Sequence, residues 1–295
     1  MASASFRSFM AKYLDELGFL SSDAVPDVWL RPAAKDNGEE YYEYILMYVD
    51  DILVISHRGR EVLESLQSKD RVKFKNSKIS KPGMYLGGKL QLKTINGIKC
   101  WTMSGHKYLS AVVKNVEEYV GNTKFQVPRK ATAPIDNTYV PELDETNKLN
   151  PKLHTYYQEL IGMLRWGTEL GRVDILHEVS ILSQFQASPR EGHLDQLLRI
   201  VAYIRDKPKV TIYMDPSFPN IDYSDFEVNR KDFEDYYRNV EETKPNNMPR
   251  PRGKFVKTTA FVDASFGQIK RIENPIQGIS FLQIVHRYFG IQNNK

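Results

Sequence analysis

The sequence predicts an α+β fold, in which an antiparallel sheet with helices is followed by a helical region and then by the start of an α/β domain. Two pairs of apolar runs, each divided by a short polar turn, predict β-hairpins in the first third of the chain. Three segments with helical periodicity after residue 150 predict a small bundle. The expected domains are a sheet domain at 1–103, a helical domain at 104–214, a linker at 215–256 and an α/β start at 257–295.

The composition indicates an intracellular globular protein. Hydrophobic residues make up 41% and charged residues 26% of the chain, which argues against wholesale disorder. No apolar stretch approaches the ~18 residues of a membrane-spanning helix, and no secretory signal is visible. The single cysteine, Cys100, argues against a disulfide framework or a Cys-based zinc site. The six histidines lack metal-ligand spacing, so we expect them to be structural or on the surface.

The charge of the chain is divided unevenly along its length. Residues 58–130 contain 16 Lys/Arg and 5 Asp/Glu, a net charge of +11, whereas the remainder carries −7. Such asymmetry is typical of a polyanion-binding surface. The alternative is that the lysines simply solvate strands and turns.

The first expected elements are a helix and a loop. Apolar side chains recur at three- and four-residue spacing over 6–17, and Gly18 is expected to end this helix. A polar loop containing Pro26, Pro32 and Gly38 is expected to follow.

The next elements are a hairpin and a short helix. The apolar runs Glu43–Val49 and Ile52–Ser56 predict a hairpin that turns at Asp50-Asp51, although Asp-Asp is a poorer turn pair than Asn-Gly. Residues 60–69 predict a short helix.

The remaining elements follow from periodicity and turn residues. Asn96-Gly97 is a strong turn signal between the strands of a second hairpin. Ser104 precedes a helix with an apolar face. The expected elements are strands at Met84–Leu92 and Ile98–Met103, the helix after Ser104, an extended connection at Thr132–Pro151, helices at 151–169, 172–186 and 190–206, and strands at Val210–Met214, Thr258–Ala264 and Gly278–Val285.

The clearest chemical feature is Tyr48-Val49-Asp50-Asp51 at the apex of the first hairpin. Adjacent carboxylates repel each other and gain little as turn residues. A polymerase needs hard oxygen ligands for two divalent cations about 3.5–4 Å apart, and Mg²⁺ prefers carboxylates and water. The alternative is an ordinary acidic turn between two core strands.

This apex and the strand after it, Tyr-Val-Asp-Asp-Ile-Leu-Val, resemble the catalytic motif of reverse transcriptases in the form used by copia-type LTR retrotransposons. Further segments resemble motifs of that family in the same order, over about residues 6–285. They are Leu17-Gly18-Phe19, Asp27, Tyr85-Leu86-Gly87-Gly88, Tyr156 with Ile161-Gly162 and Leu164, Arg172 with Asp174-Ile175, Leu182-Ser183 with Phe185, Pro189 with His193, and Phe261-Val262-Asp263-Ala264.

The resemblance implies a segment of a Pol polyprotein with a partial reverse-transcriptase palm, a helical thumb and connection, and the start of an RNase H-like domain. It implies that Asp50 and Asp51 ligate Mg²⁺ or Mn²⁺ and carry nucleotidyl transfer, with Tyr48 and Val49 lining the primer end. The implied partners are an RNA template, an RNA–DNA hybrid and dNTP, without a membrane. The expected location is the cytoplasm, within a virus-like particle, or the nucleus.

The resemblance also implies contacts with nucleic acid outside the apex. Residues Tyr85 to Gly88 resemble the hairpin that grips the primer strand, where glycine lets the backbone approach nucleic acid closely. Nearby lysines are expected to contact phosphates, which position a duplex without reading its sequence; the alternative is a solvated lysine-rich loop. These lysines are Lys73, Lys75, Lys78, Lys81 and Lys89.

The sequence departs from the family at both metal sites. The aspartate that the family carries on the first palm strand has no counterpart before Tyr44, so we expect a missing palm and fingers segment to act as a partner. Asp263-Ala264-Ser265-Phe266 keeps one aspartate of the RNase H site, and RNase H activity is not expected. The alternative function is a catalytically inactive retrotransposon remnant that only binds nucleic acid.

Overall fold

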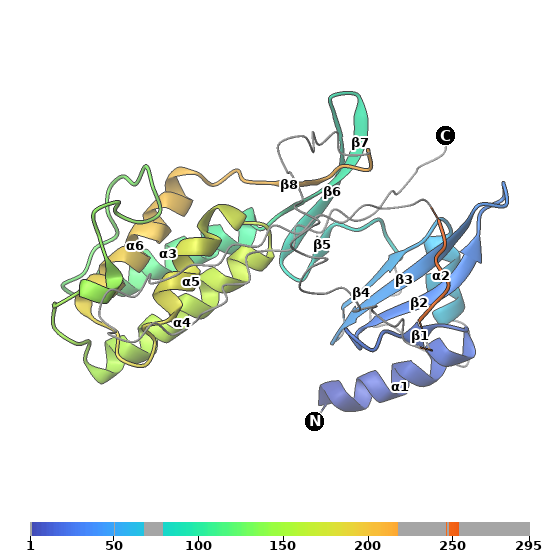
Figure 1. Cartoon of the computed structure of the whole chain (residues 1–295), viewed down its shortest axis with the longest axis horizontal. Coiled ribbons are helices and arrows are strands. Elements are labelled where there is room, and N and C mark those ends of the chain that lie inside the picture. The colour runs from blue at the N-terminus through green and yellow to red at the C-terminus, as the bar shows by residue number, and fades with distance from the viewer. Residues whose placement is uncertain (1, 50, 68–78, 218–245, 247, 254–295) are drawn as a thin grey trace, which may run out of the picture. The chain divides into compact units, whose positions relative to one another are not determined.

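The structure is a computed structural model that describes residues 2–49, 51–67, 79–217, 246 and 248–253 (Figure 1). These residues form a mixed α+β fold with two antiparallel four-stranded sheets and six α-helices. They fall into two compact units that divide between Ile79 and Ser80. The predicted α+β class is therefore confirmed.

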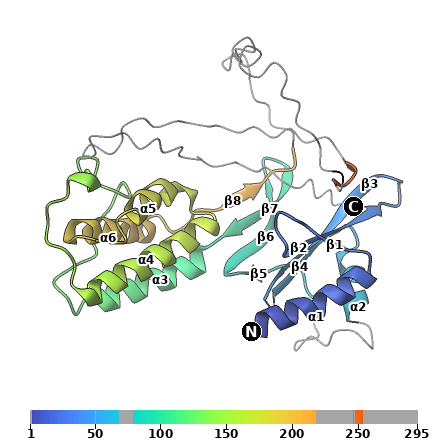
Figure 2. The same cartoon turned by 60° about the horizontal axis from the view of Figure 1, so that its bottom comes forward.

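The first unit is a sheet with two helices on one face (Figure 2). Its strands lie in the order β1-β2-β3-β4, and every neighbouring pair is antiparallel. Met10 and Leu14 of one helix and Val62 of the other pack on Ile45 and Met47 of the central strand β3. The elements are α1 (Ala2–Glu16), β1 (Leu20–Ser21), β2 (Val28–Ala34), β3 (Glu40–Tyr48), β4 (Asp51–Ile55) and α2 (Gly59–Leu66).

The sequence predicted both helices of this unit but not strand β2. The polar loop expected to contain Pro26, Pro32 and Gly38 is wrong in its middle: Pro26 and Gly38 lie in turns, but Pro32 lies inside β2 and pairs with Tyr42. Proline cannot donate to a ladder and is confined to strand edges and bulges. The short β1 pairs only with Trp29 and Leu30, so β2 has a single neighbour at Pro32 and tolerates the missing N–H there.

A distant segment of the chain also packs on the first unit. The hydroxyl of Tyr42 donates to the carbonyl of Arg250 at 2.6 Å, and Arg252 forms a 2.7 Å ion pair with Glu40. Residues 248–253 therefore lie beside the first residues of β3. Most of the predicted linker, 215–256, lies outside the described residues.

The second unit combines a helical bundle with a second sheet (Figure 1). Buried residues of the four helices, such as Leu109, Leu160, Leu182 and Leu198, form one core. The predicted bundle is confirmed. The elements are β5 (Met84–Tyr85), β6 (Gly88–Ile95), β7 (Ile98–Ser104), α3 (His106–Val120), a 3-10 turn at Pro141–Leu143, α4 (Pro151–Glu169), a 3-10 turn at Val173–Ile175, α5 (Leu176–Ser183), α6 (Glu191–Asp206) and β8 (Ile212–Met214).

Two tight turns shape the sheet of this unit. The predicted turn at Asn96-Gly97 is confirmed, and both residues have positive φ, +50° and +80°. The single strand predicted at Met84–Leu92 is wrong, because a second turn at Leu86-Gly87, with φ of +51° and +84°, divides it into β5 and β6. Positive φ at both central residues is the mark of a type I′ hairpin turn.

The units also divide at a different place from the expected boundary at residue 103. Strand β7 pairs with β6 before the bundle and with β8 after it. The second hairpin is thereby held in the same unit as the helices that follow it. The strands predicted at Thr258–Ala264 and Gly278–Val285 lie outside the described residues. Among the helices that the structure describes, none has the length and apolarity needed to span a membrane.

Candidate functional site

The hairpin of β3 and β4 carries the predicted catalytic motif at its apex. Tyr48 pairs with Asp51, which leaves a two-residue loop that starts at Val49. Val49 has φ +54°, a left-handed conformation that costs an L-residue roughly 1–2 kcal/mol. The side chains of Tyr48 and Val49 are 49% and 51% exposed, and Asp51 is exposed as well. The apex therefore presents its side chains to solvent from a strained turn.

The turn begins one residue earlier than the sequence predicted. Asp51 is the first residue of β4 and not the second residue of the turn. The register pairs Met47 with Ile52 and places both against the helices, and the turn residues follow from that packing. Asp50 lies outside the described residues.

The two faces of this hairpin have different surroundings. Residues directly opposite each other in a sheet share a face, and neighbours along a strand alternate. Met47 and Ile52 face the core formed with α1 and α2. Tyr48 and Asp51 therefore stand on the face of the sheet that these helices do not cover.

Asp27 lies next to the apex but its carboxylate has another partner. Its carbonyl accepts a hydrogen bond from the backbone N–H of Met47 at 2.9 Å. Its Oδ1 lies 3.0 Å from Nε of Arg7 in α1. The carboxylate is thus directed to the helix side of the sheet, whereas Asp51 is on the other face.

A buried carboxylate, Glu43, forms an ion pair with Arg31 and connects the hairpin to neighbouring segments. Glu43 is 4% exposed and its Oε2 accepts from Nε and Nη2 of Arg31, at 3.0 and 2.5 Å. Its Oε1 accepts from the hydroxyl of Ser56 at 2.6 Å. Arg31 also donates to the carbonyl of Leu17 at 2.7 Å, and its guanidinium lies over the ring of Phe19. The carboxylate therefore joins β2 and β3 to Ser56, just after β4, and Arg31 joins them to Leu17, just after α1.

Sequence reasoning missed this ion pair. The two residues are 12 positions apart in the sequence, and the sequence predicts a polar loop at the segment that holds Arg31. Only strand pairing, which aligns Arg31 with Glu43, reveals the contact.

The primer-grip-like residues form the turn of β5 and β6 in the second unit. Leu86 and Gly87 are the turn residues, and a Cβ on Gly87 would lie 3.6 Å from Leu170 Cδ1. Gly88 is buried, and a Cβ there would approach Met103 Cγ to 3.2 Å and the carbonyl oxygen of Tyr85 to 3.3 Å. The Gly-Gly pair therefore permits a tight turn packed against the end of α4.

The predicted phosphate-contacting lysines are only partly within the described residues. Lys81 and Lys89 are exposed, and Lys89 pairs with Ser104 in the β6–β7 ladder. Lys73, Lys75 and Lys78 lie outside the described residues, as does Asp263 of the RNase H-like segment. The described residues also contain no group of three or more His, Cys, Asp or Glu side chains that could hold a metal ion.

A second buried carboxylate, Asp144, organises the loop before α4. Its Oδ1 accepts from the hydroxyl and the N–H of Thr146, at 2.6 and 2.8 Å, and its Oδ2 accepts from the hydroxyl of Tyr139. Burial raises the pKa of Asp144, but hydrogen bonds from Thr146 and Tyr139 outweigh it and leave the pKa below its usual value. His193 lies beside this carboxylate, with Nε2 at 4.0 Å from Oδ2.

His193 is a structural residue, as the sequence suggested for the histidines. Its Nδ1 accepts the N–H of Arg190 at 3.0 Å, and its Nε2 lies 3.0 Å from the carbonyl of Pro141. These two contacts require a neutral ring with the proton on Nε2. The ring is 2% exposed and serves to cap α6 and hold the Pro141 turn.

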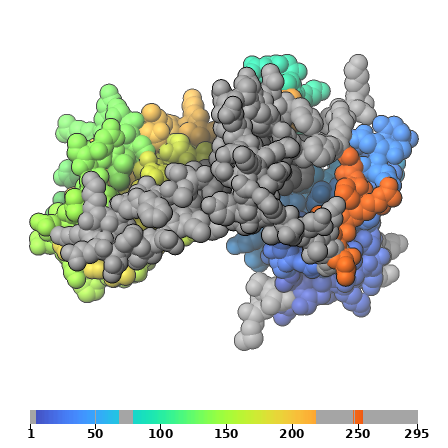
Figure 3. Space-filling model, in the orientation of Figure 1, coloured from blue at the N-terminus to red at the C-terminus, as the bar shows by residue number. Residues whose placement is uncertain are grey.

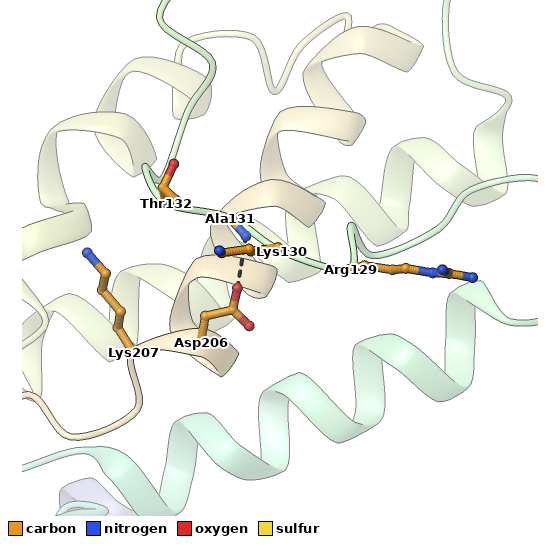
Figure 4. A pocket seen from close by; sticks show the side chains of 6 residues that line it. All are labelled: Arg129, Lys130, Ala131, Thr132, Asp206 and Lys207. Atoms are coloured by element: carbon orange, nitrogen blue, oxygen red, sulfur yellow. Dashed lines mark hydrogen bonds between the residues drawn. The ribbon is translucent and has the colours of Figure 1, made fainter.

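A shallow pocket lies where α6 ends (Figure 4). Asp206 accepts the N–H of Ala131 at 2.8 Å, and this bond is the main reason that the pKa of Asp206 lies below its usual value. Arg205 donates to the carbonyls of Pro128 and Arg129, at 2.6 and 2.8 Å. In Figure 4 the side chain of Arg129 extends away from Asp206. These hydrogen bonds therefore hold residues 128–131 against the end of α6, and the pocket lies beside them.

The chain is similar to proteins of two retrotransposons. It is 29% identical over 168 residues to a transposon Ty5-1 protein of Saccharomyces cerevisiae, across 55% of this chain and 48% of that protein. It is 24% identical over 208 residues to the retrovirus-related Pol polyprotein from transposon RE1 of Arabidopsis thaliana, across 70% of this chain and 13% of the polyprotein. No family model and no solved structure matches the chain.

These similarities relate the chain to retrotransposon Pol polyproteins. The chain spans about half of the yeast protein and about an eighth of the plant polyprotein, 48% and 13% of their lengths.

Proposed function

We propose that the chain is a reverse-transcriptase segment of a copia-type retrotransposon Pol polyprotein, that is, an RNA-directed DNA polymerase. The observation that carries the proposal is the exposed apex of β3 and β4, where the exposed residues Tyr48 and Asp51 flank a turn that begins at Val49 with positive φ. Strained backbone is concentrated at functional sites, where the surrounding structure maintains it. The similarity to two retrotransposon proteins supports the same assignment.

In this proposal the two units have different tasks. The first unit is the palm, and its sheet holds the catalytic hairpin. The second unit is the thumb and connection, with the turn at Leu86-Gly87 as the primer grip. Residues 257–295 are the start of an RNase H-like domain. An RNA template, an RNA–DNA hybrid and dNTP are the proposed partners.

Asp50 and Asp51 are the proposed ligands of Mg²⁺ or Mn²⁺. Asp51 fits this role, because its exposed carboxylate stands on the face of the sheet opposite α1 and α2 and carboxylates are hard oxygen ligands. When bound, the divalent cations activate the primer 3′ hydroxyl and stabilise the leaving pyrophosphate. Tyr48 and Val49 would line the primer end beside these carboxylates.

The described residues do not supply a complete two-metal site. Asp27 is directed to Arg7, and no group of three metal-binding side chains occurs in the described ranges. Within the described part of the chain, strand β4 is at the edge of its sheet, so an added strand has a backbone edge to pair with beside Asp51. We propose that such a strand, supplied in trans, brings the further carboxylate.

The incomplete set of carboxylates also favours the second candidate function. A catalytically inactive remnant would keep the hairpin and the lysines and would bind nucleic acid without extending a primer. Steep salt dependence of binding without extension is the expected behaviour of that remnant, because phosphate contacts release counterions.

Primer extension distinguishes the two functions. The test uses the full chain, an RNA template, a DNA primer and Mg²⁺ or Mn²⁺. We expect extension that is lost in Asp50→Asn/Asp51→Asn and kept in Glu159→Gln/Glu169→Gln, which removes two charges from the exposed face of α4. Adding a separate palm and fingers segment is expected to increase the extension. No extension under either condition, by a chain that binds the hybrid, would identify the inactive remnant.

A further inference from the structure

A segment from late in the chain completes the first unit. Residues 248–253 belong to this unit, although β8, the strand before them in the chain, pairs with β7 in the second unit. Figure 1 shows the segment, in orange, beside β2 and β3, and Figure 3 shows it at the surface of the first unit. The chain therefore returns to the first unit after it has formed the second.

The segment alternates proline with arginine. It reads Met248-Pro249-Arg250-Pro251-Arg252-Gly253 and contains no helix or strand. Each proline fixes its own φ near −65° and keeps the residue before it extended. A backbone restricted in this way loses little conformational freedom when it docks. The two arginines are thus presented at a fixed spacing on an extended chain.

The segment is received by Glu40 and Tyr42 at the start of β3. These two residues are two positions apart in the strand, so their side chains share a face of the sheet. Ile45 and Met47 alternate with them and pack on α1 and α2. Glu40 and Tyr42 therefore stand on the face opposite the helices, where Pro32 of β2 pairs with Tyr42.

Three kinds of contact meet at these two side chains. The hydroxyl of Tyr42 donates to the carbonyl of Arg250 at 2.6 Å. Nη1 of Arg252 lies 2.7 Å from Oε1 of Glu40. The guanidinium of Arg252 also lies 5.8 Å from the centroid of the Tyr42 ring, within the range at which an aromatic face attracts a cation. Together they engage the backbone, the charge and the flat guanidinium group of the segment.

The two arginines contribute unequally. The side chain of Arg252 is only 19% exposed, whereas that of Arg250 is 77% exposed and lies 3.8 Å from Glu40. Exposed ion pairs contribute little to stability. Arg252 is therefore the anchoring side chain, and Arg250 contributes mainly its carbonyl group.

We propose that Glu40 and Tyr42 form a peptide-binding site for an arginine that follows proline in an extended segment, and that residues 249–252 of this chain are its ligand. Aromatic side chains that dock proline-rich extended peptides are a recurring mode of recognition. The site anchors the chain, so that whatever follows residue 253 starts from the first unit.

This anchor is a different site from the hairpin apex. Six residues of β3 separate Tyr42 from Tyr48, roughly 20 Å along a strand. The inference goes beyond the proposed polymerase function and does not depend on it.

Limited digestion of the full chain with trypsin tests the anchor. Trypsin cleaves after arginine but not before proline, so within the segment it attacks the Arg252–Gly253 bond. When release and docking are fast, cleavage follows the population of released segment. We expect Glu40→Gln/Tyr42→Phe to be cleaved there about tenfold faster, because a hydrogen bond and an ion pair are lost. Mass spectrometry of the fragments measures the rate.

Two control variants test the specificity of the effect. Glu64→Gln removes one negative charge from an exposed position on α2 and should leave the cleavage rate unchanged. Arg250→Gln should change the rate by less than about twofold, because that side chain is exposed. Far-UV circular dichroism checks that every variant is folded.

Hydrogen exchange gives a second measurement that needs no protease. Arg252→Gln should speed the exchange of amides at the start of β3 and leave those of β6 and β7 unchanged, because the anchor is in the first unit. Unchanged cleavage in Glu40→Gln/Tyr42→Phe would overturn the proposal. So would equal acceleration in Glu64→Gln, or unchanged exchange at β3 in Arg252→Gln.

Discussion

The two units each bury a carboxylate among their described residues, and they satisfy it in different ways. Glu43 in the first unit is 4% exposed and is paired with the charged Arg31. Asp144 in the second unit is 7% exposed and receives its nearest hydrogen bonds from neutral groups of Tyr139 and Thr146. Both carboxylates tie loops to regular elements.

The difference determines how the ion pair of Glu43 and the hydrogen bonds of Asp144 respond to mutation and to pH. An ion pair loses most when one partner is removed, because the other charge is left buried without compensation. A carboxylate held by neutral donors also depends on its ionisation, because protonation turns one of its acceptor positions into a donor and removes the negative charge that strengthens the other hydrogen bonds. We therefore expect the first unit to be sensitive to mutation of either partner of its ion pair, and the hydrogen bonds of Asp144 in the second unit to weaken in acid.

The largest expected effect is on the first unit. Glu43→Ala leaves the guanidinium of Arg31 without its carboxylate partner. We expect the free energy of opening of the first unit to fall by an amount toward the lower end of about 3–5 kcal/mol, because Arg31 is still 28% exposed. Hydrogen exchange of the β3 amides reports the free energy of opening of this unit. The control Glu64→Ala, which removes an exposed partner of Arg60, should change this free energy of opening by less than about 1 kcal/mol.

A double variant controls for the loss of side-chain volume. Glu43→Leu with Arg31→Met removes both charges and keeps apolar bulk, so it should be more stable than Glu43→Ala. Equal destabilisation in the two variants would contradict the role of the unpaired charge.

The second effect concerns Asp144. Asp144→Ala removes the acceptor of Tyr139 and Thr146, and leaving such groups unsatisfied costs roughly 1–3 kcal/mol. Because the folded-state pKa lies below the unfolded value, this stabilisation is present above the usual pKa of about 3.9 and is lost as the pH falls through the folded pKa.

The measurement is the free energy of opening of α4 and α6 by hydrogen exchange at neutral pH and at pH near 3. The difference between wild type and Asp144→Ala should be large at neutral pH and shrink in acid. A difference that stays constant across this range would show that the ionised carboxylate does not fasten the loop.

The smallest effect compares the hairpin turns of the two units. Val49 and Asn96 both have positive φ, +54° and +50°, but only Asn adopts that conformation readily. Val49→Asn is expected to stabilise the first hairpin by about 1 kcal/mol and Asn96→Val to destabilise the second by a similar amount. Urea unfolding of each variant checks the two signs.

A stabilised Val49→Asn variant is also informative about function. If the apex is the polymerase site, primer extension should fall although stability rises, because strain at functional sites is part of their arrangement. A variant that gains stability and keeps full extension would show that the Val49 conformation serves folding alone.

Much of the fold followed from local patterns. The apolar spacing over 6–17 predicts α1, Asn96-Gly97 predicts the turn of β6 and β7, and the three helical segments predict the bundle. These signals succeed because neighbours along the chain decide them. Strand β2 was missed because Pro32 argues against a strand unless the pairing of its neighbours is known.

The sequence predicted which residues lie at the apex of the first hairpin, but it predicted their geometry only in part. The motif Tyr48 to Asp51 located the apex, but the turn moved by one residue because packing against the helices sets the register. The ion pair of Arg31 and Glu43 joins segments that have no local signal of contact. The functional roles predicted for all of the site residues, including Asp50, Asp51, the primer-grip-like turn, the lysines and Asp263, stay predictions.

The amino-acid order determined the helices, the β3–β4 and β6–β7 hairpins and the carboxylate motif, because each depends on residues within a few positions of one another, and it determined the uneven charge through composition alone. Tertiary structure decided which strands pair, which face of the hairpin carries Asp51, and which carboxylates are buried with partners. These features arise from contacts between distant segments, where a shift of one residue would move every side chain to the other face. Lys93 and Lys99 show both levels, since the sequence supplies the charges and the pairing of β6 with β7 places them on opposite faces of the sheet.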